Sequence, residues 1–424
     1  MRAGGGIRFS LALVVLCALL AGCTTTADED HPHYRERART ATDGPLTISV
    51  AALSPRESAE IYESPLAALG IQPVWLEVEN RDTEPYWFLP QGIDPDYFPY
   101  WEAAEAFNPG GVGAVDSERR ERFKSLSLPA IIPPGTTTSG FVLTNLDEGF
   151  KFVHADFLKN GQIHHISVIV GVPGLRADFR ERKTFERPLY SEAQIVHYDT
   201  DESFLQAVSE LPCCASNESG SRLADPLNLV IVGGENDALS ALAERGWHPT
   251  EITWSGSIFR MVAAAMSGDK YYNAPISPMY LFGRSQDLAL QKARDNIHQR
   301  NHLRLWLAPM RYRGKPVWVG QISRDIGTRL TIYSPYLTTH KIDPDVDEAR
   351  VALIEDLAYS RHLATVGQTD GVGAATADEP RRNLTRDPYY TDGKRVVLIF
   401  DERNVAMDEI HFIRHAEQED HARD

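Results

Sequence analysis

The sequence predicts a protein of the α+β class, in which a sandwich of short strands precedes a mixed sheet covered by helices. Three observations support this. Short segments with alternating apolar residues, each bounded by Pro, Gly, Asn or Asp, follow one another from Leu46 to Gly174. Beyond residue 225, strand-like runs are interspersed with amphipathic helical segments. The chain has 424 residues, which is enough for two domains.

The N-terminus has the pattern of a signal peptide, predicted over residues 1–22. Arg2 and Arg8 accompany the apolar run Phe9–Leu20, which is too short to span a bilayer as a mature helix. Cys23 directly follows small residues, so this segment resembles the lipobox of bacterial lipoproteins. The resemblance implies that Cys23 is lipidated (palmitate) and becomes the mature N-terminus. Thr24 in place of aspartate favours the outer membrane, facing the periplasm. The alternative is an ordinary secretory signal that ends near a cysteine.

The rest of the chain divides by composition. Alternation in residues 74–79, where Val74, Leu76 and Val78 lie opposite Trp75, Glu77 and Glu79, predicts a strand with one buried face. Several such strands and an acidic helical insert near residues 100–123 predict an immunoglobulin-like sandwich, a type of domain that often serves as a spacer or interaction surface. The predicted divisions are a flexible tether (23–44), the sandwich (45–175), a connector (176–224), a second domain (225–402) and a charged tail (403–424).

The second domain shows its elements in a clear order. A continuous apolar run at residues 226–234 predicts a buried strand. Further strands are expected at 277–284, 301–310, 315–323, 328–334 and 394–402, and helices at 236–248, 257–268 and 344–363. The four residues 311–314 separate two of these strands and predict an antiparallel hairpin.

Charge and cysteine content restrict the function. The formal net charge is −16, and loss of the two arginines in the signal segment makes it −18, which disfavours binding to nucleic acid. Cys213 and Cys214 are adjacent, so in an oxidising periplasm they could form a vicinal disulfide, remain thiols or bind a soft metal.

Five motifs of the second domain carry a resemblance to a known family. They are "SPMYLFGRSQDLALQKA", "RNHLRLWL", "PVWVGQISRD", "TTHKIDPDVDEAR" and "DPYYTDGKRVVLIF". In this order they resemble the LssY C-terminal domain, over about Asp225 to Phe400. That domain occurs in bacterial proteins, sometimes beside membrane-bound modules that resemble lipid phosphatases. The resemblance implies a shared set of motifs and no particular reaction.

The first candidate site lies on the predicted strand "NHLRLWL". Alternation places His302, Arg304 and Trp306 on one face, while the other face carries only leucines. If the leucines alone provide the core face, the polar face lines a ligand cleft. The alternative is a partly buried polar cluster in which Trp306 packs along the stem of Arg304 and His302 donates to a carboxylate.

The second candidate site surrounds "THKIDPDVDEAR". Asp343 before Pro344 predicts a helix N-cap, and capping explains the acidic residues that follow. His340 is not explained by capping. With His302 and Asp343 it could form a site for a divalent metal with two histidines and one carboxylate, or an acid/base pair. A purely structural role for these residues is the alternative.

The third candidate group is Arg284, Asp287 and Asp325. Arg284 and Asp287 follow a strand end, where ligand clefts often form, and Arg284 with Arg304 could hold a phosphate or carboxylate. The alternative is an Arg284–Asp287 pair that braces the turn. Asp325 lies beside a glycine turn and is a further candidate acid.

Three functions are consistent with these patterns. The first is an envelope lipoprotein that binds a ligand or a protein partner. The second is an envelope hydrolase acting on a phosphorylated lipid or glycan, with or without a metal. The third is a structural spacer. We favour the binding protein, because the sequence contains no nucleophile elbow, P-loop or HExxH motif.

Overall fold

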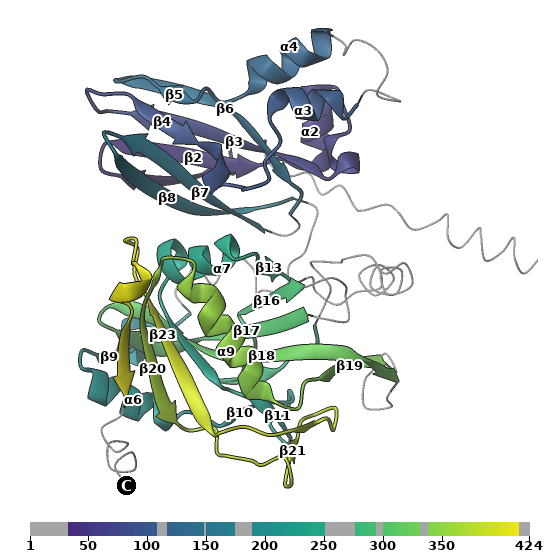
Figure 1. The fold of residues 1–424 in the computed structure, drawn as a ribbon, viewed down its shortest axis with the longest axis vertical. Coiled ribbons are helices and arrows are strands. Elements are labelled where there is room, and N and C mark those ends of the chain that lie inside the picture. The colour runs from purple at the N-terminus through teal and green to yellow at the C-terminus, as the bar shows by residue number, and fades with distance from the viewer. Residues whose placement is uncertain are drawn as a thin grey trace, which may run out of the picture.

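The computed structural model describes residues 33–107, 117–147, 150–173, 189–250, 276–293, 300–330 and 338–414. Within them the chain forms a β-sandwich and a second domain built on a ten-stranded sheet (Figure 1). Several sheets with a smaller number of helices agree with the predicted α+β class. Cys23, the part of the predicted charged tail (403–424) beyond residue 414 and the predicted helix at 257–268 lie outside the described residues. Within that predicted tail, His411–Arg414 form a strand of the large sheet.

The sandwich consists of two four-stranded antiparallel sheets, ordered β1-β2-β3-β6 and β5-β4-β7-β8. Val74, Leu76 and Val78 face a core that both sheets share, which confirms the alternation expected for this strand. The immunoglobulin-like relationship stays a prediction. The strands are β1 (Arg39–Asp43), β2 (Leu46–Ala52), β3 (Ile71–Asn80), β4 (Tyr86–Leu89), β5 (Ile131–Ile132), β6 (Thr136–Asn145), β7 (Phe150–Lys159) and β8 (Gln162–Gly171).

Helices α2 (Pro55–Tyr62), α3 (Tyr100–Glu105) and α4 (Ser117–Leu126) contribute to a second apolar cluster on the sandwich. The last two occupy the region of the predicted helical insert.

Residues 33–44, which belong to the predicted tether (23–44), are part of the fold. Tyr34 is buried in the second apolar cluster of the sandwich, and the Arg37 guanidinium lies 2.6 Å from the Glu57 carboxylate. β1 pairs with β2 across a turn at Gly44, whose φ is +54°. β1 has no apolar face because its residues are largely exposed, so hydrophobic periodicity could not reveal it.

The second domain is built on a mixed sheet ordered β13-β16-β17-β18-β12-β23-β20-β24, with β19 beside β18 and β9 beside β17. The β12–β23, β20–β24 and β17–β9 pairs are parallel, and the others are antiparallel. The strands are β9 (Val196–Tyr198), β12 (Leu229–Val232), β13 (His248–Pro249), β16 (Leu288–Ala293), β17 (Arg300–Tyr312), β18 (Lys315–Leu330), β19 (Thr338–Ile342), β20 (Leu363–Asp370), β23 (Lys394–Phe400) and β24 (His411–Arg414).

The β17–β18 hairpin forms as predicted, with a tight turn at Arg313 and Gly314, both of positive φ. The segment 277–284, predicted as one strand, instead bends at Phe282 and Gly283 into a short hairpin of β14 and β15. The small elements are β10 (Cys214–Ser216), β11 (Leu223–Pro226), β14 (Tyr280–Leu281), β15 (Arg284–Ser285), β21 (Arg381–Arg382) and β22 (Pro388–Tyr389).

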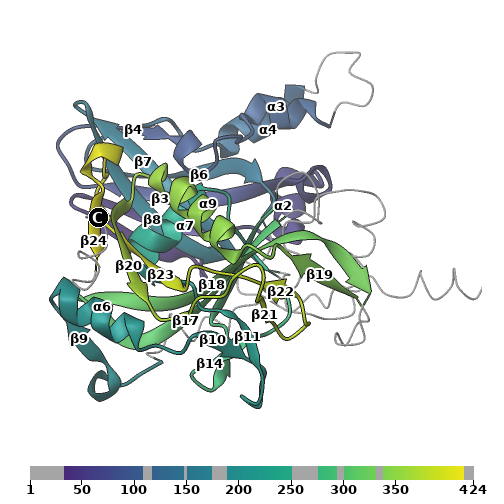
Figure 2. The same cartoon turned by 60° about the horizontal axis from the view of Figure 1, so that its bottom comes forward.

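Apolar residues cover both faces of the large sheet. On one face, α9 (Val346–Ala358) and α7 (Ser240–Glu244), which follows the π-helical turn η4 (Glu235–Leu239), pack over leucines of β16 and β17. On the other face, α6 (Asp201–Ser209) packs with Trp306 and Tyr312 of β17. Figure 2 shows α6 apart from α7 and α9. The predicted helix at 236–248 is thus divided between η4 and α7.

The two domains share part of one core. Phe150 at the start of β7 is 4% exposed and belongs to the same cluster as Leu242 and Trp247 of the second domain. Phe152 and Ile169, on the outer face of the β7–β8 hairpin, also pack against this cluster. The side of the sandwich formed by β7 and β8 therefore docks on the second domain (Figure 1).

We expect Phe150→Ala to lower the free energy of unfolding of the full chain by about 3 kcal/mol, because it opens a cavity in the shared core. Thermal and urea unfolding followed by circular dichroism would measure the loss. Phe412→Ala is the control, because Phe412 is 75% exposed and should cost little. Equal stability of the two variants would contradict the shared core.

Candidate functional site

The polar face of β17 lies in the interior. Leu303 and Leu305 face the core beneath α7 and α9, and Trp306 faces the core beneath α6. His302 and Arg304 lie on the Trp306 side and are only 5% and 4% exposed. The ligand cleft expected on this face is thus replaced by a buried cluster. The expectation of a cleft assumed that one face of leucines completed the core, whereas this sheet is covered on both faces.

The cluster is held by internal contacts. Arg304 Nη1 donates to Gln321 Oε1 at 2.8 Å. His302 Nε2 lies 3.5 Å from the Asp325 carboxylate, and Arg300 Nε lies 3.4 Å from the same oxygen. We call this group the buried polar layer; it comprises Asp225, Gln291, Arg300, His302, Arg304, Gln321, Ser323 and Asp325.

Burial dominates the acids of the buried polar layer. It raises the pKa of Asp325 to about 7, although the Arg300 guanidinium favours the charged form. Burial also raises the pKa of Asp225, against the opposing effects of Arg304 and a hydrogen bond from Asn383 Nδ2 at 2.9 Å. Asp225 was not singled out from the sequence, because no local pattern places it near β17.

Arg284 and Asp287 brace a turn, as the structural alternative proposed. Arg284 Nε and Nη2 donate to the two Asp287 oxygens at 2.9 and 2.7 Å. Nη1 donates to Tyr190 Oη at 2.8 Å, and Nη2 also donates to the Leu307 carbonyl at 2.6 Å. Both side chains are buried, so this pair has its hydrogen-bonding groups directed at the protein.

The N-cap of α9 is Asp345 and not the predicted Asp343. The Asp345 side chain accepts from the amides of Asp347 and Glu348, while Asp343 Oδ1 accepts from the Asp345 amide at 3.1 Å. Asp343 therefore orders the approach to the helix. His340 pairs through its backbone with Thr328 on β18, and its side chain is outside the described residues.

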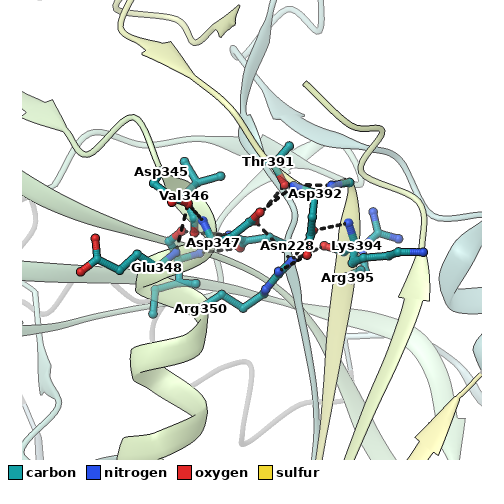
Figure 3. Close-up of polar contacts among 12 residues, drawn as sticks. Asn228, Asp345, Val346, Asp347, Glu348, Arg350, Thr391, Asp392, Lys394 and Arg395 are labelled. Carbon is teal, nitrogen blue, oxygen red and sulfur yellow. Dashed lines mark hydrogen bonds and ion pairs between the residues drawn. The ribbon is translucent and has the colours of Figure 1, made fainter. Parts of the chain in front are cut away.

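The first turns of α9 make hydrogen bonds to the start of β23 and to the residues just before it, which belong to the last family motif. Asp347 accepts from Thr391 Oγ1 at 2.8 Å and from the Asp392 amide at 2.6 Å. Arg350 donates to both Asp392 oxygens at 3.1 and 2.7 Å and to the Lys394 carbonyl at 2.6 Å. Figure 3 shows these side chains pointing toward one another. The motifs "TTHKIDPDVDEAR" and "DPYYTDGKRVVLIF" thus have a structural role, because they hydrogen-bond to each other.

Cys213 and Cys214 form a vicinal disulfide in the structure. The Cys213 carbonyl accepts from the Leu227 amide at 2.8 Å, which fixes the loop against the entry to β12.

A cleft of about 600 Å³ lies between the two domains. The sandwich contributes the outer face of the β7–β8 hairpin and the loop at Asp94 to Asp96, and the second domain contributes α7, Trp247 and His362. None of the candidate residues chosen from the sequence lines this cleft.

The most concentrated group of titratable side chains in the cleft is a histidine cluster. His154 Nε2 lies 3.1 Å and His165 Nδ1 lies 2.6 Å from the same Asp156 oxygen. Glu244 and His362 approach from the second domain, with the Glu244 oxygen 3.3 Å from His154 Nδ1 and 3.5 Å from His362 Nε2. His154, Asp156 and His165 each offer a donor atom, all within 4.8 Å of one another, so they could hold a metal ion.

The histidines and carboxylates of the cluster stabilise one another's charged forms. Burial alone would lower the pKa of His154, but Asp156 and Glu244 outweigh it and raise that pKa. Burial would raise the pKa of Asp156, but the two histidines lower it to about 2. In His362, burial is likewise outweighed, mainly by Glu244, so the pKa rises.

One signal in the sequence could have located these residues. Asn160 and Gly161 form a two-residue turn with positive φ at both positions, a pattern strongly associated with tight hairpins. Such a turn fixes the register, so that Asp156 pairs directly with His165. His154, two residues before Asp156, then lies on the same face. No local sequence pattern predicts that Glu244 joins the cluster, because its position there depends on docking of the two domains.

Residues 205–394 match the family model described as LssY C-terminus, and this part of the chain belongs to that family. The match begins within α6, contains most of the large sheet and α9, and leaves the sandwich outside. No curated protein matches the chain.

We expect the stability difference between the wild type and Asp325→Asn to depend on pH. The folded-state pKa of Asp325 is raised, so its stabilising contribution is full below the ordinary value near 4 and is lost as pH rises to about 7. The free energy of unfolding of the wild type should therefore fall relative to Asp325→Asn between pH 4 and pH 7, by up to about 1.4 kcal/mol per pH unit. Parallel stability profiles in urea titrations would contradict a protonated, buried Asp325.

Proposed function

We propose that this protein is a lipid-anchored lipoprotein of the bacterial envelope that binds a ligand in the interdomain cleft. The observation that carries the proposal is the cleft itself, because both domains contribute to its walls. Ligand sites occur preferentially at domain interfaces, in clefts of roughly 300–1000 Å³. The volume of about 600 Å³ falls in this range.

The N-terminal sequence supports the anchor. A signal-like apolar run, small residues and Cys23 follow one another in the order that lipoproteins use. Among the described residues, no helix is long and apolar enough to cross a membrane.

The charge of the cleft indicates the class of ligand. Carboxylates outnumber lysine and arginine side chains in its wall, which also carries four histidines, and Lys151 is engaged by Asp147. Such a surface favours amines and hydroxyl groups over phosphates. The acids are Asp94, Asp96, Asp147, Asp156 and Glu244, and the basic side chains are Lys151, Arg361 and the histidines His154, His165, His248 and His362. We therefore propose an amine-bearing or hydroxyl-rich envelope molecule. A hydrolase, the alternative function, would act in this cleft and not at the buried face of β17.

We expect Cys23→Ser to abolish lipid attachment, because the thiol is the acceptor. Bacterial cells that express the full chain would be labelled with an alkyne analogue of palmitate and fractionated. The wild type should be labelled and sediment with membranes, and Cys23→Ser should do neither. Cys17→Ser is the control, since Cys17 lies within the segment to be removed. Equal labelling of Cys23→Ser would disprove the anchor.

We expect the full chain to bind peptidoglycan fragments released by a muramidase, which carry amines and hydroxyls. Asp96→Asn should weaken binding at least about threefold in calorimetry, because Asp96 is exposed in the cleft wall. Asp408→Asn removes an exposed carboxylate outside the cleft and should leave binding unchanged. Absence of saturable binding by the wild type, or equal effects of the two substitutions, would count against this ligand class.

A further inference from the structure

The outer face of the β7–β8 hairpin carries three side chains with the chemistry of metal ligands. His154 and Asp156 are two residues apart on β7, and His165 lies directly across from Asp156 on β8. They are intermediate in exposure, with 12%, 19% and 23% of their side chains accessible. The core face of the same hairpin is apolar, so packing of the sandwich does not require polar residues on the outer face.

Each imidazole directs one nitrogen at Asp156 and has its other nitrogen held elsewhere. His154 Nδ1 lies 2.7 Å from Ser167 Oγ and 3.3 Å from the Glu244 carboxylate. His165 Nε2 lies 3.1 Å from the side-chain amide of Asn404. Metal-binding histidines almost always donate the N–H of the second nitrogen to an acceptor, which fixes the ring and its tautomer. His154 Nδ1 faces such acceptors in Ser167 and Glu244. For His165, the Asn404 amide presents its oxygen to Nε2 when the amide group is flipped.

The carboxylate is also confined. A Cβ added at Gly92 would lie 2.6 Å from Asp156 Oδ2, so the glycine allows the backbone to approach this oxygen closely. With Oδ2 beside Gly92, the oxygen Oδ1 is the one directed between the two imidazoles.

We propose that His154, Asp156 and His165 bind a zinc ion, with a fourth position open to the interdomain cleft. Imidazole nitrogens and a carboxylate oxygen are ligands that zinc prefers, and three protein ligands with an open position are typical of accessible zinc sites. Tetrahedral zinc requires donor atoms about 3.3 Å apart. The donor atoms here lie within 4.8 Å of one another, so modest side-chain rotations accommodate the ion.

The second domain completes the surroundings of this site. Glu244 on α7 and Asn404 near β24 hold the outer nitrogens of the two ligating histidines, although both belong to the second domain. Docking therefore orients the ligands, and zinc binding in turn stabilises the docked arrangement by the same free energy. Zinc thus holds the sandwich and the LssY C-terminal domain together, and we call this effect the clasp.

The test uses the full chain, solubilised without a histidine tag, stripped with chelator and titrated with zinc chloride in a calorimeter. We expect one zinc ion per chain. His165→Ala and Asp156→Asn should each weaken binding by at least tenfold. His164→Ala is the matched control, because His164 is adjacent, faces Asp43 3.2 Å away and should leave zinc affinity unchanged. Circular dichroism would verify that each variant folds, and His165→Gln replaces His165→Ala if the latter does not.

Glu244→Gln separates the clasp from a site within the sandwich alone. Glu244 is a positioning residue, so we expect this variant to bind zinc about tenfold more weakly and to show a smaller zinc-induced rise in melting temperature. Failure to bind zinc stoichiometrically, or equal losses in His164→Ala and His165→Ala, would overturn the site. Unchanged affinity in Glu244→Gln would overturn the clasp.

The zinc site lies in the wall of the cleft assigned to the proposed function and adds to that function. The two can fail separately, because binding of peptidoglycan fragments is measured on the zinc-free chain. Retained fragment binding without zinc binding would reject only the metal site, and the reverse result would reject only the ligand class.

Discussion

Burial of the outer face of the β7–β8 hairpin is the constraint on which the functional geometry depends. Antiparallel sheets commonly leave one face to water. Here Phe150, Phe152 and Ile169 place apolar surface on that side, and the second domain covers it. The cover is incomplete toward His154 and His165, and the remaining space is the interdomain cleft. The shared core and the cleft therefore arise from docking, and docking also brings Glu244 and His362 to the histidines of the hairpin. A change in the relative position of the domains would alter all three.

In this arrangement, ligand binding in the cleft and docking of the two domains are thermodynamically linked, so that each changes the free energy of the other. Any molecule that contacts both walls of the cleft favours the docked state, in proportion to its differential affinity. The apolar contacts around Phe150 supply a part of docking that involves no charged groups. The pairs His154–Glu244 and Asp147–His248 supply a part that depends on salt concentration. The protein can thus hold its domains together and still respond at their junction.

The sequence predicted much of the framework, because local patterns determine it. The β17–β18 hairpin, the strands at its flanks and the helix after Pro344 follow from periodicity, turn residues and capping. Alternation correctly placed His302 and Arg304 on one face. It could not tell what covers that face, because α6 and Trp306 complete a second core through contacts distant in sequence. The N-cap of α9 is Asp345 and the prediction was Asp343, because the local capping rules do not distinguish these two aspartates. The histidine cluster needed both a hairpin register and a docked Glu244, and only the former is encoded locally.

The burial of Tyr34 in the sandwich limits how far the folded protein can lie from a lipid attached to Cys23. If Cys23 carries the lipid, only eleven residue steps separate it from Tyr34, which is buried in the sandwich. A fully extended chain of that length spans about 40 Å. Under the proposed lipid anchor, the start of the folded body therefore stays within this distance of the bilayer. Under the same proposal, a ligand of the cleft has to be present near the bilayer, and the length of the segment between Cys23 and Tyr34 limits which envelope structures the protein can contact.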